Sequence, residues 1–249
     1  MLFISIASKS SKETCSIFLI QNINQVSKDR KGNPMLLGQT NKVGLQQEPF
    51  NNWFDKNFDE YQENDKIIKA IKKDLNDYSI KVFYGTWCGD SKKELPRFYK
   101  LIEAANFPEK QLEVFALSNV KGSHKQGPNG EEKGYNIHRV PTFIFYKDGK
   151  EVNRIVEHPK ETLERDIQNI ITGKRYSPNY SVVNYLDKKM KEQSLDSLQI
   201  MKKDLIPYLS NYTKGSGELN TYGYALIRSE ELDKALYVFD LNTKIYPYK

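Results

Sequence analysis

The chain has 249 residues, of which 38% are hydrophobic and 28% charged, so it can bury a real core, and a fully disordered protein is excluded. The formal net charge is +6, but lysines alternate with acids through most segments. We therefore interpret the charge as a solvated surface and expect no nucleic acid as a partner.

The only two cysteines, Cys15 and Cys88, exclude a scaffold stapled by several disulfides and a zinc site of four cysteines. Three scattered histidines do not supply a metal motif, and neither a metal nor another cofactor is expected.

The first 49 residues are mostly polar, and only the run 15–21 is typical of a strand. We expect an N-terminal extension over residues 1–49, an arm packed loosely on the rest. The apolar run 2–7 is too short for a membrane span and has no basic residue before it, so membrane association is not indicated. The compartment stays open between the cytoplasm and the cell envelope, with a weak or truncated export signal as the alternative.

Residues 50–174 are expected to form one α/β domain. Asp65 is a suitable N-cap for a helix whose apolar side chains recur at helical spacing, namely Ile67, Ile68, Ile71 and Leu75. Strands are predicted at 79–86, 111–117, 142–146 and 151–157. Asp148 and Gly149 are typical of the hairpin turn between the last two strands. Helical periodicity predicts one helix directly after Cys88 and another over 160–172.

After Gly173, a polar joint that contains proline leads to an α-helical C-terminal region, residues 178–249. Its clearest helices are predicted at 219–228 and 229–246, and one face of the second carries Leu232, Ala235, Leu236 and Phe239. The pair resembles one tetratricopeptide-like unit, although a solenoid needs at least about three. We interpret these helices as a cap on the domain or a contact with a partner, and a homodimer at this end is a further hypothesis.

The motif that carries chemistry is Trp-Cys-Gly-Asp-Ser at 87–91, where a buried strand is followed by a helix. At a helix start, unpaired backbone N–H groups and the positive end of the helix dipole stabilise a thiolate. Cys88 is therefore expected to be a nucleophile, the alternative being an inert core cysteine. Lys92 and Lys93 strengthen the effect if they face the sulfur, whereas Asp90 opposes it, and their balance stays open.

The order of strand, Trp-Cys motif, helix and strand, followed by Val-Pro-Thr at 140–142, a hairpin and a final helix, resembles the thioredoxin superfamily. In detail it is similar to bacterial thioredoxin-like proteins with a Cys-x-Asp-Ser motif and a helical tail. The resemblance covers residues 67–173 and implies a three-layer α/β/α sandwich with a central mixed sheet. It also implies that the peptide bond before Pro141 is cis, and that Val140 offers backbone groups to an extended peptide.

The substrate-binding residues that this resemblance implies are Trp87, Gly89, Asp90, Val140 and Pro141, with Trp87 as an apolar wall beside the sulfur.

The catalytic residues expected from the motif are Cys88 and Ser91, and Ser91 is the main departure from the family. It stands where dithiol members have their second cysteine, and a serine hydroxyl cannot be a disulfide partner. Cys88 could therefore form a mixed disulfide but could not resolve it within the motif. A buried acid and its partner lysine commonly serve the second thiol in the family. Here Val82 and Ala116 occupy the corresponding positions.

Two hypotheses stay open. In the first, Cys88 exchanges with protein disulfides, and an external thiol from a small molecule or a partner's cysteine completes the cycle. In the second, the chain is a redox-inactive module that binds a peptide or protein partner beside Pro141. The first is favoured, because a binding module has no need for a thiol at a helix start. Cys15 is expected to be incidental, with a role as the resolving thiol as the alternative.

Other aromatic residues could in principle contact a peptide. We favour a surface position for His138, with a place at the rim of the peptide groove as the alternative. Tyr84, Trp53 and Phe54 are expected to pack in the core.

Overall fold

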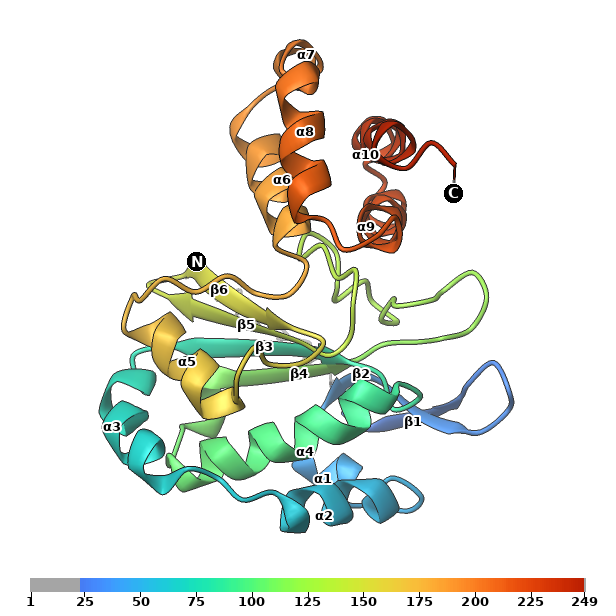
Figure 1. The fold of residues 1–249 in the computed structure, drawn as a ribbon. Helices are drawn as coiled ribbons and strands as arrows, with labels where there is room; N and C mark the ends of the chain where they lie inside the picture. The colour runs from blue at the N-terminus through green and yellow to red at the C-terminus, as the bar shows by residue number, and fades with distance from the viewer. Residues whose placement is uncertain (1–22, 249) are drawn as a thin grey trace, which may run out of the picture.

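The computed structural model describes residues 23–248. In that part of the chain, six strands form one mixed sheet in the order β1-β2-β4-β3-β5-β6 (Figure 1). The strands are β1 Gln25–Lys28, β2 Pro34–Thr40, β3 Ser79–Tyr84, β4 Leu112–Ala116, β5 Thr142–Lys147 and β6 Lys150–Val156. β3 and β4 are parallel, and every other neighbouring pair is antiparallel. Four of the strands lie where periodicity predicted them.

Helices cover one face of this sheet (Figure 1). They are α1 Lys42–Leu45, α2 Asn51–Glu60, α3 Asp65–Leu75, α4 Gly89–Ala104 and α5 Leu163–Ile171, and a short 3-10 helix, η1, spans Glu109–Gln111. Val82 and Tyr84 of β3 point into the core between sheet and helices, because alternate side chains of a strand face opposite sides. Phe54 and Tyr84 are fully buried and Trp53 packs against the same core, as predicted.

The opposite face of the sheet is covered by the long loop between β4 and β5, residues 117–141. Phe83 of β3 and Ile144 of β5 form a second apolar cluster there with Leu117, Ile137 and Val140 of the loop. The mixed sheet with helices and a helical C-terminal region confirms the predicted fold class. The loop ends at Pro141, which the sequence predicts beside the thiol.

The C-terminal region consists of helices only, as predicted: α6 Ser181–Glu192, α7 Leu195–Ile200, α8 Lys202–Tyr212, α9 Gly217–Arg228 and α10 Leu232–Ile245. They share an apolar core of their own and stand over the β4–β5 loop (Figure 1). No helix within 23–248 has both the length and the apolar character needed to cross a bilayer.

The predicted apolar face of α10 is wrong in part. Ala235 is buried and Phe239 packs against the same core, but Leu232 and Leu236 are 60% and 67% exposed, whereas Val238 and Leu241 are fully buried. Apolar residues occur on more than one side of this helix, so periodicity leaves several faces available. Packing against α8 and α9 selects the buried one.

Residues 23–49 also differ from the loosely packed arm that their composition predicts. β2 pairs with β4, with Gly38 opposite Ala116, and its Met35 and Leu36 are buried. β2 lies between β1 and β4, and its short run interrupted by Gly38 and polar residues gives only a weak strand pattern in the sequence. The strand predicted at 15–21 lies outside the described residues, and the division at 1–49, 50–174 and 178–249 stays a prediction.

Two local signals can be compared with the structure residue by residue. The N-cap of α3 is Asn64, whose side-chain oxygen accepts from the N–H of Ile67 at 3.2 Å. The predicted cap, Asp65, lies one residue later, in the first turn, where an acid also suits the helix dipole. The hairpin turn was predicted correctly: Asp148 and Gly149 both have positive φ, 51° and 73°, as a tight two-residue turn requires.

Candidate functional site

Cys88 is the N-cap residue of α4, at the junction with β3 that the sequence predicts. Its backbone is extended, with φ −94° and ψ 130°. Its N–H donates to the carbonyl of Gly85 at 2.9 Å, and its own carbonyl accepts from the N–H of Lys92 at 3.0 Å. The chain thus turns sharply after the strand and starts the helix directly behind the thiol.

The thiol is partly exposed and lies beside the segment that carries Pro141. Cys88 Sγ donates to the carbonyl of Val140 at 3.2 Å, and the Val140–Pro141 peptide bond is cis. The side chain makes no capping hydrogen bond to the first turn of α4, because the protonated thiol is a donor and turns toward an acceptor. The structure therefore brings together Cys88, Val140 and Pro141.

Ser91 lies one helical turn behind the thiol and is fully buried. Its Oγ accepts from the N–H of Gly85 at 3.2 Å, so the hydroxyl holds the turn that presents the motif. Val82 and Ala116 are also fully buried and belong to the apolar core. The two positions where the family commonly keeps an acid and a lysine are therefore apolar in this chain.

Trp87 forms one side of the site. Its Nε1 donates to the carbonyl of Leu117 at 2.8 Å, and its ring lies 5.3 Å from the ring of His124. A Cβ at Gly85 would lie 2.5 Å from the indole, so only glycine allows this ring position. Gly89 and Asp90 are exposed on the first turn of α4, at the open side of the motif.

A cation that sequence reasoning missed lies close to the thiol. Lys125 of the β4–β5 loop donates from Nζ to the carbonyl of His138 at 2.6 Å. Burial, together with the positive charges of Arg228 and Arg139, lowers the pKa of Lys125 to about 8, whereas Cys88 has the opposite effect. No local pattern marks this lysine, because the loop has neither helical nor strand periodicity.

Of the two lysines predicted to act on the thiol from α4, Lys93 is largely exposed and lies 3.6 Å from the carboxylate of Glu94. The effect of Lys92 on the thiol stays a prediction.

The surface position predicted for His138 is wrong. Its side chain is buried, with Nδ1 3.3 Å from the carbonyl of Asn136 and the rings of Tyr180 and Tyr222 packed edge-on at 5.5 and 6.5 Å. Burial lowers its pKa to about 3, so the imidazole is neutral. The residue is covered because the C-terminal helices pack onto this loop, which local sequence does not reveal.

These helices hold the loop through polar contacts as well. Arg228 of α9 donates to the carbonyl of Ile137 at 2.9 Å. Asp187 of α6 accepts from the side-chain amide of Asn136 and from the hydroxyl of Tyr222. The segment that leads to Pro141 is therefore fixed by the C-terminal region.

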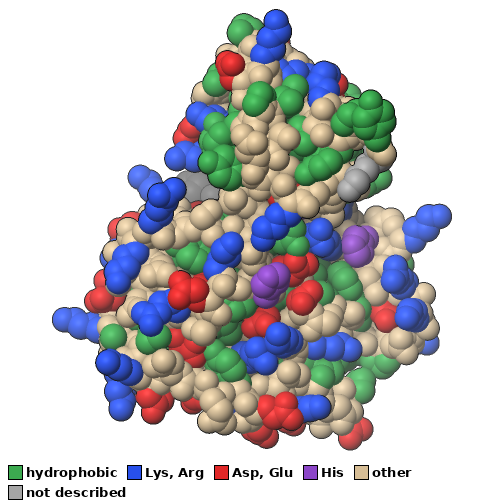
Figure 2. All heavy atoms as spheres, viewed as in Figure 1, with side chains coloured by type: hydrophobic (Ala, Val, Ile, Leu, Met, Phe, Trp, Pro, Cys, Tyr) green, Lys and Arg blue, Asp and Glu red, His purple; other side chains and the backbone are tan. Residues whose placement is uncertain are grey.

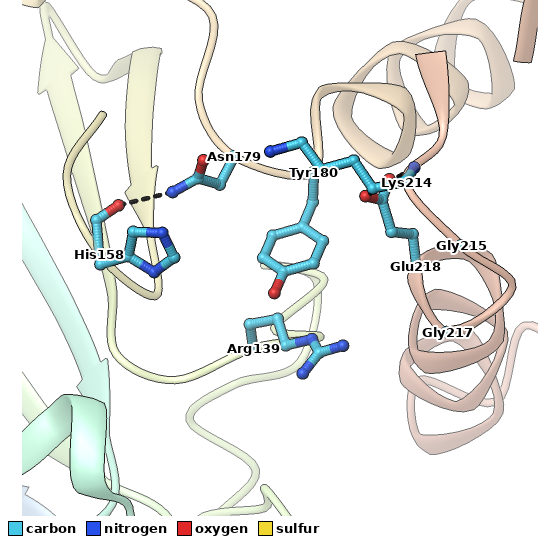
Figure 3. Close-up of a pocket in the computed structure, with 8 residues that line it drawn as sticks. All are labelled: Arg139, His158, Asn179, Tyr180, Lys214, Gly215, Gly217 and Glu218. Atoms are coloured by element: carbon cyan, nitrogen blue, oxygen red, sulfur yellow. Dashed lines mark hydrogen bonds between the residues drawn. The ribbon is translucent and has the colours of Figure 1, made fainter. Parts of the chain in front are cut away.

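A cavity of ≈ 360 Å³ lies where the C-terminal region meets this segment (Figure 3). In it, the guanidinium of Arg139 lies 4.8 Å from the ring centre of Tyr180, and the Asn179 amide donates to the carbonyl of His158 at 2.8 Å. Lys and Arg side chains gather along this junction on the face that Figure 2 shows. Within residues 23–248 there is no group of three or more His, Cys, Asp or Glu side chains placed to hold a metal ion.

Comparison with known proteins agrees with this geometry. The thioredoxin family model matches residues 60–169. The thiol-disulfide oxidoreductase ResA of Bacillus cereus is 35% identical over 121 residues, which cover 41% of this chain and 69% of that protein. A thioredoxin H-type of Picea mariana is 33% identical, with 34% of this chain and 60% of that protein covered.

Two further similarities are more partial. The TPR repeat-containing thioredoxin TDX of Arabidopsis thaliana is 32% identical over 40% of this chain and 23% of its own length. The X-ray structure of Fasciola hepatica thioredoxin shares 23% identity, with a TM-score of 0.28, over 43% of this chain and 89% of that one. The match to the family model and the similarity to ResA decide the assignment: the chain belongs to the thioredoxin family.

Proposed function

We propose that this protein exchanges thiols and disulfides with protein substrates through Cys88 alone. The observation that carries the proposal is the position of Cys88 Sγ, partly exposed and 3.2 Å from the Val140 carbonyl beside Pro141, with buried Ser91 in place of a second thiol. The thioredoxin-like relatives support thiol-disulfide oxidoreductase chemistry in general terms. The single-thiol cycle is our addition.

The reaction has two exchange steps. The Cys88 thiolate attacks one sulfur of a substrate disulfide, a new S–S bond to Cys88 forms, and the substrate's own S–S bond breaks. The second substrate sulfur leaves as a thiolate and takes up a proton. An external thiol, from a small molecule or from a partner's cysteine, then loses its proton and attacks the substrate sulfur of the mixed disulfide. Cys88 leaves as a thiolate, and the external sulfur stays bonded to the substrate.

The neighbouring residues have supporting roles in this proposal. Trp87 is the apolar wall beside the sulfur, while Gly89 and Asp90 leave the approach to it open. The Val140 side chain is buried, so only its backbone can pair with an extended substrate. Ser91 keeps the turn in place through Gly85 and takes no part in bond exchange.

The C-terminal helices are the proposed contact for a partner protein. The α9 and α10 helices pack against each other, and their sequence resembles one tetratricopeptide-like pair. A TPR repeat-containing thioredoxin is among the relatives. A second copy of the chain is an alternative partner at this surface.

The proposal is tested in a Cys15→Ser background, in which Cys88 is the only cysteine. Incubation with an excess of a disulfide-linked peptide should give a stable adduct of one peptide on Cys88, detected by intact mass, and a small thiol should release it. Adding Ser91→Cys should abolish the stable adduct, because a second thiol at this position can resolve it within the motif. Ser91→Ala is the matched control and should keep the adduct.

Two results would overturn the single-thiol cycle. One is an adduct that forms no faster than with a free cysteine peptide. The other is capture of partner proteins that Cys88→Ala leaves unchanged while no adduct appears, which is the behaviour of a redox-inactive binding module.

A further inference from the structure

A second cavity, of ≈ 420 Å³, opens between the β4–β5 loop and α9. The loop side contributes His124 and Lys125, and the helix side contributes Tyr224, Ile227 and Arg228. The His124 ring at the edge of the cavity lies 5.3 Å, between centres, from the ring of Trp87, which is the wall beside Cys88. The cavity therefore lies next to the thiol site, on the side of the C-terminal helices.

The cavity contains two cations, Lys125 and Arg228, that bind backbone carbonyls. Lys125 and Arg228 donate to the backbone carbonyls of His138 and Ile137, and within residues 23–248 neither side chain forms an ion pair. Arg139, a nearby cation, does have an acidic partner: its guanidinium lies 3.5 Å from the carboxylate of Glu157.

Because Lys125 and Arg228 are partly buried, a bound anion would stabilise their charged forms. Burial lowers the pKa of both Lys125 and Arg228, since their charged forms are partly removed from water. Glu132 opposes the shift at Arg228, but its own carboxylate accepts from the N–H of Gly127 at 2.8 Å. An anion entering the cavity would give both cations the partner they lack.

Beside Arg228, the helix side of the cavity carries an apolar surface. Tyr224 is 54% exposed and Ile227 40% exposed, and the Tyr224 ring is supported edge-on by Phe239 at 5.5 Å. A bare inorganic anion would leave this surface uncovered. A peptide with an acidic side chain next to an aromatic or aliphatic one would use both walls.

We propose that this cavity, which we call the α9 cavity, binds the segment of a protein substrate that flanks its reactive disulfide. An acidic side chain of that segment lies against Lys125 and Arg228, and an apolar side chain packs on Tyr224 and Ile227. The inference rests on the proposed function, because it concerns which substrates the same thiol site selects. It assigns part of that selectivity to the C-terminal region.

The test measures how fast Cys88 reacts with short synthetic peptides that carry a central cysteine as a 2-thiopyridyl disulfide. Exchange bonds the peptide sulfur to Cys88 and releases 2-thiopyridone, which is followed by absorbance. In the Cys15→Ser background, a peptide flanked by Glu-Phe should react about tenfold faster than one flanked by Lys-Phe. Lys125→Gln and Arg228→Gln should each reduce this preference about threefold or more, and Tyr224→Ala should slow both peptides.

Matched controls are Lys121→Gln, an exposed lysine of the same loop that lies outside the cavity, and Tyr248→Ala, a tyrosine that is 97% exposed. Both should behave as the parent. A preference below twofold, or one that Lys121→Gln reduces as much as Lys125→Gln does, would overturn the inference in favour of the general positive charge.

A separate measurement distinguishes failure of the cavity from failure of the thiol. Fluorescence anisotropy with a Cys88→Ser variant and labelled peptides that carry serine in place of cysteine reports binding without chemistry. Selective binding of the Glu-Phe peptide with an unreactive Cys88 would reject only the proposed function. Rapid exchange without selectivity would reject only the α9 cavity.

Discussion

The side chain of His138 shows how much one residue depends on its surroundings in this protein. Its imidazole Nε2 is buried without a hydrogen-bond partner in the described part of the chain, and three cations act on it, namely Arg154, Lys125 and Arg139. Burial is the largest cause of its low pKa, about 3, and these cations add to it, against the hydrogen bond to Asn136. The folded protein therefore keeps the ring neutral at pH values where the unfolded chain protonates it.

This difference predicts a loss of stability in acid. The pKa of His138 is about 3 in the folded protein, against about 6.5 in the unfolded chain. Between these two pH values the unfolded state binds one more proton than the folded state. Unfolding free energy that is present at neutral pH is therefore lost as the pH falls through that range. When the pH is lowered from 7 to 4.5, the unfolding free energy of His138→Gln should fall by about 2 kcal/mol less than that of the parent. Urea denaturation at each pH measures both changes. The exposed His158→Gln is the control and should follow the parent. Parallel profiles for His138→Gln and the parent would refute the buried neutral ring.

At the scale of elements, α9 and α10 pack closely at Gly223. A Cβ at this position would lie 2.5 Å from Cε1 of Phe239, whose ring is also in edge contact with Tyr224. Glycine costs helix stability relative to alanine, about 1 kcal/mol in a helix interior. Here the close packing of the two helices offsets that cost, and it also positions the α9 wall of the cavity.

Gly223→Ala should therefore destabilise the protein by about 1 to 3 kcal/mol although alanine is the better helix former, because the new methyl group displaces the Phe239 ring. Urea unfolding followed by circular dichroism measures the change. A second substitution, Phe239→Leu, should recover part of the loss by making room. Gly217→Ala, with nothing within 4 Å of its ideal Cβ, serves as the comparison and should be neutral or stabilising. Equal effects at the two glycines would contradict the close-packing argument.

At the scale of the whole molecule, the C-terminal helices and the sheet domain share a polar junction. Asp187 accepts from Asn136 of the Pro141 segment and from Tyr222 of α9, and Arg228 reaches back to the carbonyl of Ile137. These contacts join the loop cluster on one face of the sheet, to which Ile137 belongs, to the apolar core among α6–α10. The junction is therefore expected to make the two parts unfold together.

Asp187→Ala should weaken this coupling, because the Tyr222 hydroxyl and the Asn136 amide lose their acceptor, at a cost of about 2 to 4 kcal/mol. Both tryptophans of the chain, Trp53 and Trp87, lie in the sheet domain, so their fluorescence reports that part, while circular dichroism at helical wavelengths reports both. The two transitions should coincide in the parent and separate in the variant. Glu192→Ala, an exposed acid on α6, should leave them coincident. Coincident transitions in Asp187→Ala would show that the junction is not what couples the two parts.

Much of the fold follows from local sequence. Strands over residues 79–157 have apolar runs bounded by turn residues, and the long helices carry apolar side chains at helical spacing, so both can be predicted without knowing their neighbours. The start of α4 at Cys88 is likewise local, because a strand that breaks at Gly85 leaves the motif at the next helix start.

Other features depend on residues far apart in the chain. β2 is recognisable only through its pairing with β4, and the buried face of α10 only through α8 and α9. The loop 117–141 has neither helical nor strand periodicity, so its conformation cannot be predicted without the elements that pack on it.

The sequence by itself therefore determined the α/β order, the helical C-terminal region and the lone thiol at a helix start, since each depends on neighbours along the chain. Tertiary structure alone decided that His138 is buried and that Lys125 and Arg228 line one cavity next to Trp87. The reason is physical: burial and unpaired charge depend on which surfaces pack together, and Arg228 lies 91 residues from the carbonyl that it contacts.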